Sequence, residues 1–264
     1  MKKCRFGIIG LGHMGKAILD GLDSVAFLEP KTVGLYTLDK DTLVFYKDKG
    51  YTIFENEKDL ALNTEIVLIA IKPQDMDSLI ETIKDCNINT LVSIAVGISI
   101  NYFKNHFNCP VIRLMPNMPL QLRNGATALS HSIDVSENDL NLVLDLFKVL
   151  GTCHIIDESL MNDIVIVNGS TPAYVYYYID CMLKDAISRG IDENIAKDML
   201  IETFIGSAKM LRENTASIES QINAVCSKGG TTIEAITTLK ENKLDEIIKQ
   251  ANTNCVNRAK VLGK

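Results

Sequence analysis

The sequence has no tryptophan, only six prolines and no long apolar run. No apolar stretch approaches the length that spans a bilayer, so no membrane-spanning segment is predicted. Lys2 and Lys3 resemble the start of a secretion signal, but the apolar segment behind them is short and interrupted by glycines. With a net charge of −6, the chain also lacks a basic stripe, and no nucleic-acid partner is expected. We therefore expect a soluble, cytoplasmic protein.

Cysteine and histidine are present but follow no ligand pattern. The seven cysteines are scattered and form no C-x-x-C pair, and the four histidines have no metal-ligand spacing. Scattered cysteines in odd number are typical of reduced thiols in a cytosolic protein. We expect neither disulfides nor a metal site.

A glycine motif stands at the start of the chain. Phe6 to Ile9 is a short apolar run, and Gly10, Gly12 and Gly15 follow it at G-x-G-x-x-G spacing, running into a helical pattern. In such a motif the first glycine permits a tight turn, the second lets the backbone approach a pyrophosphate, and the third lets the helix pack against the sheet. Unpaired N–H groups at the helix start favour phosphate. The motif predicts a dinucleotide site, with a glycine-rich turn of some other α/β protein as the alternative.

Strand and helix patterns alternate through the first 160 residues. Alternation with short loops predicts an α/β fold, here a Rossmann-like doubly wound parallel sheet. Residues 65–71 are almost continuously apolar, as expected of a strand covered on both faces. The predicted strands are 6–9, 32–36, 51–54, 65–71, 91–96, 111–115 and 153–156, and the predicted helices are 41–49, 56–62, 75–85, 99–107 and 136–150.

Beyond about residue 160 the strand signals end, and helices are expected throughout. We predict two domains, a dinucleotide-binding Rossmann domain over 1–160 and a helical dimerisation and substrate domain over 161–264. Residues 174–179 are apolar around most of a helical turn, which is typical of a helix that is buried or meets a partner. A homodimer through this domain is expected, with a self-contained bundle on a monomer as the alternative. The predicted helices are 173–189, 193–213, 231–240 and 244–260.

The end of the second predicted strand is where a Rossmann unit meets the adenosine ribose. Thr37 and Lys40 suit the 2′-phosphate of NADP, whereas Asp39 suits the 2′-hydroxyl of NAD. Spacing does not tell which side chain faces the ribose, so the cofactor preference stays open. Alternatively, Asp39 caps the next helix.

A second glycine motif lies in the helical part of the chain. Ser227, Gly229 and Gly230 lead into a predicted helix that begins with Thr231 and Thr232. Backbone N–H groups and hydroxyls at such a helix start suit a small anion, for example a carboxylate. The alternative is a loop whose Thr231 only caps its helix.

Five motifs occur together and in order, and as a set they resemble the pyrroline-5-carboxylate reductase family over essentially the whole chain. The resemblance implies reduction of 1-pyrroline-5-carboxylate to L-proline, the last step of proline biosynthesis, with NADPH as cofactor and NADH as the alternative. It also implies an active site that combines the cofactor of one subunit with the helical domain of its partner, and larger rings of dimers in some members. The motifs are the glycine motif, Ile71-Lys72-Pro73-Gln74, Arg113-Leu114-Met115-Pro116-Asn117-Met118-Pro119, Gly169-Ser170-Thr171-Pro172-Ala173-Tyr174 and Ser227-Lys228-Gly229-Gly230-Thr231-Thr232.

The resemblance also implies roles for individual residues. Thr232 is implied as the catalytic residue, because its hydroxyl can reach the imine nitrogen. The residues implied to bind the substrate are Ser227, Gly229, Gly230, Thr231 and Thr232. The motifs and the resemblance together predict a cofactor site formed by Gly10, Leu11, Gly12, His13, Met14, Gly15, Thr37, Asp39, Lys40, Asn56, Ala70, Ile71, Lys72, Pro73, Met115, Asn117 and Pro119.

Several residues depart from the family pattern. Lys228 replaces the usual proline, Met118 the usual threonine, Leu120 a small residue, and Gln221 an apolar one. These departures keep two alternatives open: a related reductase for another imine or a hydroxyacid, and a non-catalytic NAD(P)-binding regulator. An iminium is already protonated and needs less acid catalysis than a carbonyl. Because no histidine follows His154, we expect catalysis mainly by positioning.

Overall fold

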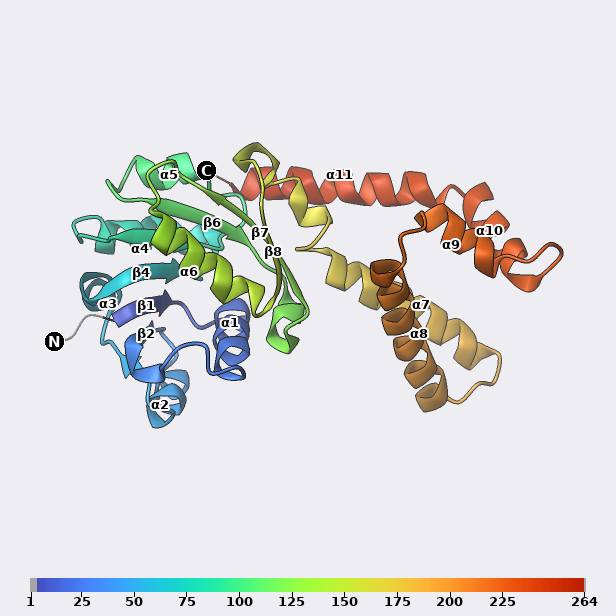
Figure 1. Ribbon diagram of the computed structural model, residues 1–264, viewed down its shortest axis with the longest axis horizontal. Helices are drawn as coiled ribbons and strands as arrows, with labels where there is room; N and C mark the ends of the chain where they lie inside the picture. Colours follow the sequence, from blue (N-terminus) through green and yellow to red (C-terminus); the bar gives the residue numbers. More distant parts are fainter. Residues whose placement is uncertain (1–3, 264) are drawn as a thin grey trace. The chain divides into compact units, whose positions relative to one another are not determined.

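The computed structural model describes residues 4–263, which divide into two compact units (Figure 1). The sheet unit contains the described residues up to Pro172 together with those from Cys255 onward, and the helical unit is Ala173–Asn254. The division of roles expected at residue 160 stays a prediction, because compactness alone does not assign a function to either unit.

The described residues of the sheet unit contain one eight-stranded sheet. Its strands are β1 (Cys4–Ile9), β2 (Val33–Tyr36), β3 (Thr52–Ile53), β4 (Thr64–Ile69), β5 (Thr90–Ser93), β6 (Val111–Met115), β7 (Gly125–His131) and β8 (Gly151–Ile155). They lie in the order β3-β2-β1-β4-β5-β6-β7-β8, and every neighbouring pair is parallel except β6 and β7. The predicted Rossmann-like parallel sheet is confirmed, with one strand reversed.

The reversed strand β7 is missing from the sequence prediction. Its residues Gly-Ala-Thr-Ala-Leu-Ser-His are mostly small or polar and contain a single β-branched side chain, so they carry little strand signal. Pairing with β6 brings Leu129 opposite Leu114, and both side chains are fully buried. Tertiary pairing, rather than local propensity, therefore forms this strand.

Helices cover both faces of the sheet (Figure 1). Successive strand residues point to opposite faces, so Ile8 packs in a core with one set of helices and Ile9 in a core with the other. The first core contains side chains of α1 (His13–Asp23), α2 (Lys40–Asp48) and α6 (Glu137–Lys148), and the second those of α3 (Glu57–Asn63), α4 (Met76–Ile83) and α5 (Ile100–Lys104). Short 3-10 helices are Pro30–Thr32, Pro73–Asp75, Met118–Leu122, Glu158–Leu160 and Ile164–Ile166.

The helical unit is built from five helices, two of which continue from or into the sheet unit. α7 and α8 pack together, with the rings of Tyr178 and Phe204 5.9 Å apart, edge to face. The short helix α9 was not predicted; Ser217 caps it by accepting a hydrogen bond from the Ser220 N–H at 3.1 Å. The helices are α7 (Thr171–Ser188), α8 (Glu193–Glu213), α9 (Ile218–Val225), α10 (Thr231–Glu241) and α11 (Leu244–Leu262).

Large apolar side chains of the helical unit are exposed in the single chain. Tyr176 and Tyr177 of α7 are 63% and 72% exposed, and Met199 of α8 is 65% exposed. The chain's own helices therefore leave part of the apolar surface of α7 exposed. Among the described residues no helix has both the length and the apolar character needed to cross a membrane.

Candidate functional site

Two clefts open in the sheet unit at the carboxyl ends of its central strands. The β1–β2 cleft, of about 430 Å³, is lined by Ile9, Tyr36 and Thr37; the β4–β6 cleft, of about 440 Å³, is lined by Met115 and residues 94–96. They adjoin, because both are walled by Gly12 and by residues 70–72. The strand order changes direction between β1 and β4, and such a switch point is where open α/β sheets bind ligands.

The glycine turn after β1 is built for close approach. Gly10 has φ +97°, and a Cβ there would lie 2.8 Å from the carbonyl oxygen of Ala70. A Cβ at Gly15 would lie 2.2 Å from the carbonyl oxygen of Gly10, so only glycine lets α1 start this close to the turn. A Cβ at Gly12 would meet nothing within 4 Å, which leaves space for a ligand at that point.

The start of α1 offers hydrogen-bond donors to that space. Its N-cap, Gly12, provides no side-chain hydrogen bond, and the first turn contains no acidic residue. The first N–H groups of a helix have no partner within the helix and carry its positive dipole end. The turn and the helix start together can therefore hold a pyrophosphate.

Asp39, predicted near the ribose, is engaged elsewhere. Its carboxylate accepts hydrogen bonds from the Thr42 hydroxyl at 2.5 Å and from the N–H groups of Asp41 and Thr42 at 3.2 and 3.4 Å. The interpretation of Asp39 as the cap of α2 is confirmed. These bonds, that of the Thr42 hydroxyl first, lower the pKa of the Asp39 carboxyl. Thr37 lines the β1–β2 cleft, whereas Asp39 does not.

Two other residues predicted for the cofactor lie outside both clefts. Lys40 is the exposed first residue of α2. Asn56 caps α3 by accepting a hydrogen bond from the Asp59 N–H at 2.8 Å. The β1–β2 cleft is instead walled by Leu38, which lies two positions before Lys40, and by Glu57, which follows Asn56.

The β4–β6 cleft brings together several predicted residues. His13, Met14, Pro73 and Met115 line it, as do residues 70–72. Leu11 is only 2% exposed, and its side chain belongs to the core, so it can meet a ligand only through its backbone. The predicted cofactor residues did not include the remaining lining residues, although three of them belong to the quoted motifs. The remaining residues are Ile94, Ala95, Val96, Pro116, Val165, Gly169 and Ser170.

Asn117 and Pro119 do not line either cleft. Asn117 is 7% exposed; its Oδ1 accepts a hydrogen bond from the Ala126 N–H at 2.8 Å, and its Nδ2 donates one to the carbonyl of Asn168 at 3.2 Å. Pro119 lies in the short helix after β6, where its carbonyl accepts a hydrogen bond from the Asn124 N–H.

The second glycine motif forms a tight loop at the start of α10. Gly229 has φ +71°, and a Cβ at Gly230 would lie 2.4 Å from Ser227 Oγ. The N-cap of α10 is Gly230, without a side-chain hydrogen bond, so the alternative in which Thr231 caps the helix is wrong.

The loop leaves its donors available. Within the described chain, no hydrogen bond engages the hydroxyls of Ser227, Thr231 or Thr232. These hydroxyls lie in the loop and the first turn of α10, where the N–H groups carry the positive end of the helix dipole, an arrangement that suits a carboxylate.

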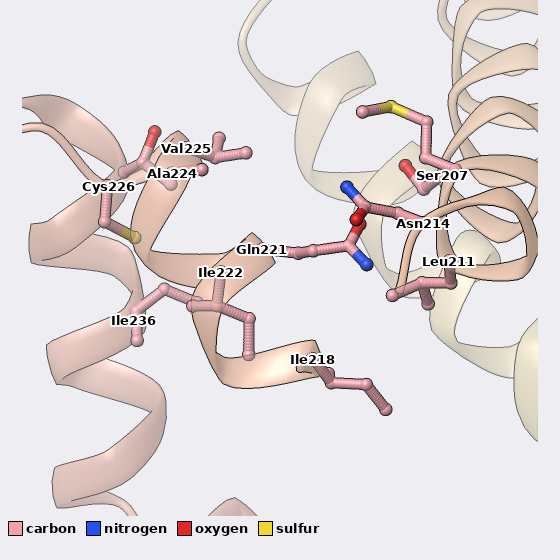
Figure 2. Close-up of a pocket in the computed structure, with 12 residues that line it drawn as sticks. Ser207, Leu211, Asn214, Ile218, Gln221, Ile222, Ala224, Val225, Cys226 and Ile236 are labelled. Atoms are coloured by element: carbon pink, nitrogen blue, oxygen red, sulfur yellow. The ribbon is translucent and has the colours of Figure 1, made fainter. Parts of the chain in front are cut away.

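A groove of about 540 Å³ adjoins this loop within the helical unit (Figure 2). Its walls come from α8, α9 and α10 and are mostly apolar, and they include Cys226 and Thr232 at the loop. Figure 2 shows the side chain of Gln221 directed toward Asn214. The Gln221 amide nitrogen is buried without a hydrogen-bond partner in the described residues.

Comparison with known proteins gives matches over both parts of the chain. Residues 5–97 match the family model described as NADP oxidoreductase coenzyme F420-dependent, and residues 158–262 match the one described as pyrroline-5-carboxylate reductase dimerisation. The chain is 32% identical over 265 residues to the pyrroline-5-carboxylate reductase of Escherichia coli strain K12, covering 98% of each chain.

Solved structures show the same fold. The structure of a pyrroline-5-carboxylate reductase from Coxiella burnetii matches with a TM-score of 0.89 and 29% identity, over 100% of both chains. The pyrroline carboxylate reductase of Plasmodium falciparum, solved with NADP bound, matches with a TM-score of 0.91 over 100% of both chains; at 24% identity this likeness concerns the fold alone.

Proposed function

Because the chain belongs to the pyrroline-5-carboxylate reductase family, we infer that it reduces 1-pyrroline-5-carboxylate to L-proline with NAD(P)H. The end-to-end likeness to a named reductase carries this inference. The two candidate sites agree with it, since the reaction needs one site for a dinucleotide and another for a small carboxylate. The departures Lys228 and Gln221 lie in and beside the carboxylate loop and leave the glycine turn untouched.

The adjoining clefts fit a nicotinamide dinucleotide. The cradle at Gly10 and Gly15, which a Cβ would fill, leaves room for the pyrophosphate. We assign the β1–β2 cleft to the adenosine and the β4–β6 cleft to the nicotinamide, which supplies the hydride when bound. NADPH is the preferred form in this proposal, because Asp39, the acid suited to NAD, caps α2 while Thr37 lines the cleft.

The loop before α10 binds the substrate in this proposal. The first N–H groups of α10, with Ser227 and Thr231, bind the carboxylate, and the Thr232 hydroxyl hydrogen-bonds the imine nitrogen. A protonated imine carries its own proton, so no separate acid is required. The contribution of the protein is to orient the acceptor and to neutralise the carboxylate.

We further propose that the protein is a homodimer formed through its helical unit. The support is the match of this region to a dimerisation family and the exposed apolar side chains of α7 and α8. A ring of dimers is the larger assembly to test. A cytoplasmic location suits the seven cysteines, all of which are free and four of which are buried.

Turnover tests the function directly. Oxidation of NADPH and of NADH should each be followed with 1-pyrroline-5-carboxylate, with L-proline identified as the product. Thr232→Val should lower kcat/KM by about 10-fold or more, since a bond to the reacting nitrogen is lost. Thr237→Val, at an exposed site on the same helix, should stay within about twofold. Cofactor binding without turnover of this imine would contradict the proposal.

The second candidate is a related reductase for another cyclic imino acid. It is favoured by Lys228, an exposed cation beside the loop glycines where the family pattern has proline. Lys228→Pro restores that pattern. A higher kcat/KM for 1-pyrroline-5-carboxylate in this variant, together with a loss on another imino acid, would support the second candidate.

A further inference from the structure

The wall of the β4–β6 cleft combines two segments that lie far apart in the sequence. Met115 and Pro116 come from the end of β6, and Gly169 and Ser170 come from the turn before α7. The sheet ladder pairs Met115 with Ala128 but includes neither Gly169 nor Ser170, so it does not set the separation of the two segments. Contacts made by side chains therefore help to hold the two segments together.

Asn168 connects them. It is 4% exposed, and its Nδ2 donates to the carbonyl of Met115 at 2.6 Å and to the carbonyl of Ala126 at 2.9 Å. One amide group thus ties the turn before α7 to the last residue of β6 and to β7. Its neighbour Gly169 is part of the cleft wall.

Asn117 makes hydrogen bonds to both Asn168 and Ala126. It donates to the backbone carbonyl of Asn168 and accepts from the N–H of Ala126, the same residue whose carbonyl Asn168 binds. Asn117, Asn168 and Ala126 thus form a closed ring of hydrogen bonds, which we call the asparagine clasp. Both asparagine side chains are buried, and a closed, buried ring is stiffer than single bonds.

The asparagine clasp leaves one buried polar atom unpaired, which is unfavourable for stability. Asn168 Oδ1 is buried and has no hydrogen-bond partner in the described chain. A buried unpaired oxygen is destabilising, and an apolar side chain of the same size would avoid it. What the apolar side chain could not supply is the pair of N–H donors to Met115 and Ala126.

Resting on the function proposed above, we propose that Asn168 is a positioning residue for hydride transfer. Through the asparagine clasp it holds Met115–Pro116 and Gly169–Ser170 at the separation that the nicotinamide ring requires. Its side chain does not line the cleft, so it acts on the cleft wall and not directly on the reacting groups. Errors of about 1 Å in a reacting geometry can cost about 100-fold in rate.

Two substitutions cut the clasp at different bonds, so the proposal stays testable if one variant fails to fold. Asn168→Leu removes both N–H donors at similar volume. Asn117→Asp keeps the oxygen that accepts from Ala126 but loses the donor to the Asn168 carbonyl. The control is Val143→Ala, a buried change in α6, which lines neither cleft.

The measurement is single-turnover hydride transfer from NADPH deuterated at its transferable position, together with melting temperature. Both clasp variants should slow hydride transfer by about 10-fold or more, while the dissociation constant for NADPH, obtained from the dependence of the single-turnover rate on NADPH concentration, changes by less than about threefold. The control should keep the wild-type rate at a similar loss of melting temperature. Clasp variants that match the control in rate would overturn the proposal and leave Asn168 a structural residue.

A second measurement distinguishes failure of this inference from failure of the proposed function. If the wild-type protein does not reduce the imine, the change in NADPH fluorescence on binding still reports the surroundings of the nicotinamide. Asn168→Leu should then alter that fluorescence change and Val143→Ala should preserve it. Equal fluorescence in all three proteins would overturn the inference independently of turnover.

Discussion

At the residue scale, the choice between NADPH and NADH should depend on Thr37, which lines the β1–β2 cleft, and not on Asp39, which caps α2. Asp39→Ala should leave the ratio of kcat/KM for NADPH and NADH within about twofold, because its carboxylate caps α2 and does not line the cleft. Thr37→Val, which removes a hydroxyl from the β1–β2 cleft, should shift the ratio toward NADH. Steady-state kinetics with both cofactors tests this. A large shift in Asp39→Ala alone would reverse the assignment.

A buried thiol should make stability fall at alkaline pH. Burial raises the pKa of the Cys109 thiol to about 11 from 9.0, so the folded chain holds this proton more tightly than the unfolded chain. The contribution to stability is complete below pH 9 and is lost as the pH rises toward 11. The unfolding free energy should fall there by up to about 1.4 kcal/mol per pH unit for this group.

Cys109→Ala should remove that share of the slope, measured by denaturant unfolding at several pH values. Val143→Ala is the control for a buried truncation, because this side chain has no proton to lose and its shortening should leave the slope unchanged. Cys153 is also buried, with its thiol pKa raised to about 11 by burial, so part of the slope should persist in Cys109→Ala. An identical slope in wild type and Cys109→Ala would contradict the expectation.

At the element scale, the sequence predicts what local pattern encodes. The apolar run of β4 and the glycine turn after β1 are readable because their periodicity and composition carry the signal. β7 was missed because its pairing with β6 comes from tertiary contacts. α9 was also missed, and none of its residues is buried in the single chain.

The candidate site also has a part that local sequence predicts and a part that only the folded chain brings together. The glycine turn is local, so its position follows from the sequence. Val165 and Gly169 reach the β4–β6 cleft from about 50 residues beyond β6, and only the folded chain brings them there. Spacing could not separate the ribose and cap roles of Asp39, because the outcome depends on the backbone path after β2.

The packing of α1 against the glycine turn carries an element-scale prediction. Gly15→Ala places a Cβ 2.2 Å from the Gly10 carbonyl oxygen, so the helix start must move away from the turn. The dissociation constant for NADPH should rise about 10-fold or more, equivalent to about 1.4 kcal/mol. Gly206→Ala in α8 is the control, because a Cβ there meets nothing within 4 Å. Equal affinity in Gly15→Ala and wild type, measured by calorimetry, would show that the turn is not the pyrophosphate site.

At the scale of the whole molecule, the distribution of apolar surface differs between the two units. The sheet unit packs large apolar side chains in cores on both faces of its sheet, although some of them, such as Leu122 and Ile133, are exposed. The helical unit exposes Tyr177 on α7 and both Ile195 and Met199 on α8. Exposed apolar surface of this kind is typical of a region that a second subunit covers.

Tyr177→Glu should therefore weaken the homodimer, because a carboxylate at a covered position would lose its hydration without gaining a partner. Sedimentation velocity should show a shift toward monomer at protein concentrations where the wild type remains a dimer. Lys148→Glu, at an exposed site on α6 of the sheet unit, should keep the dimer and controls for the added negative charge. If both variants sediment like the wild type, the interface does not include the exposed face of α7. A wild type that is monomeric at every concentration would instead support the self-contained bundle.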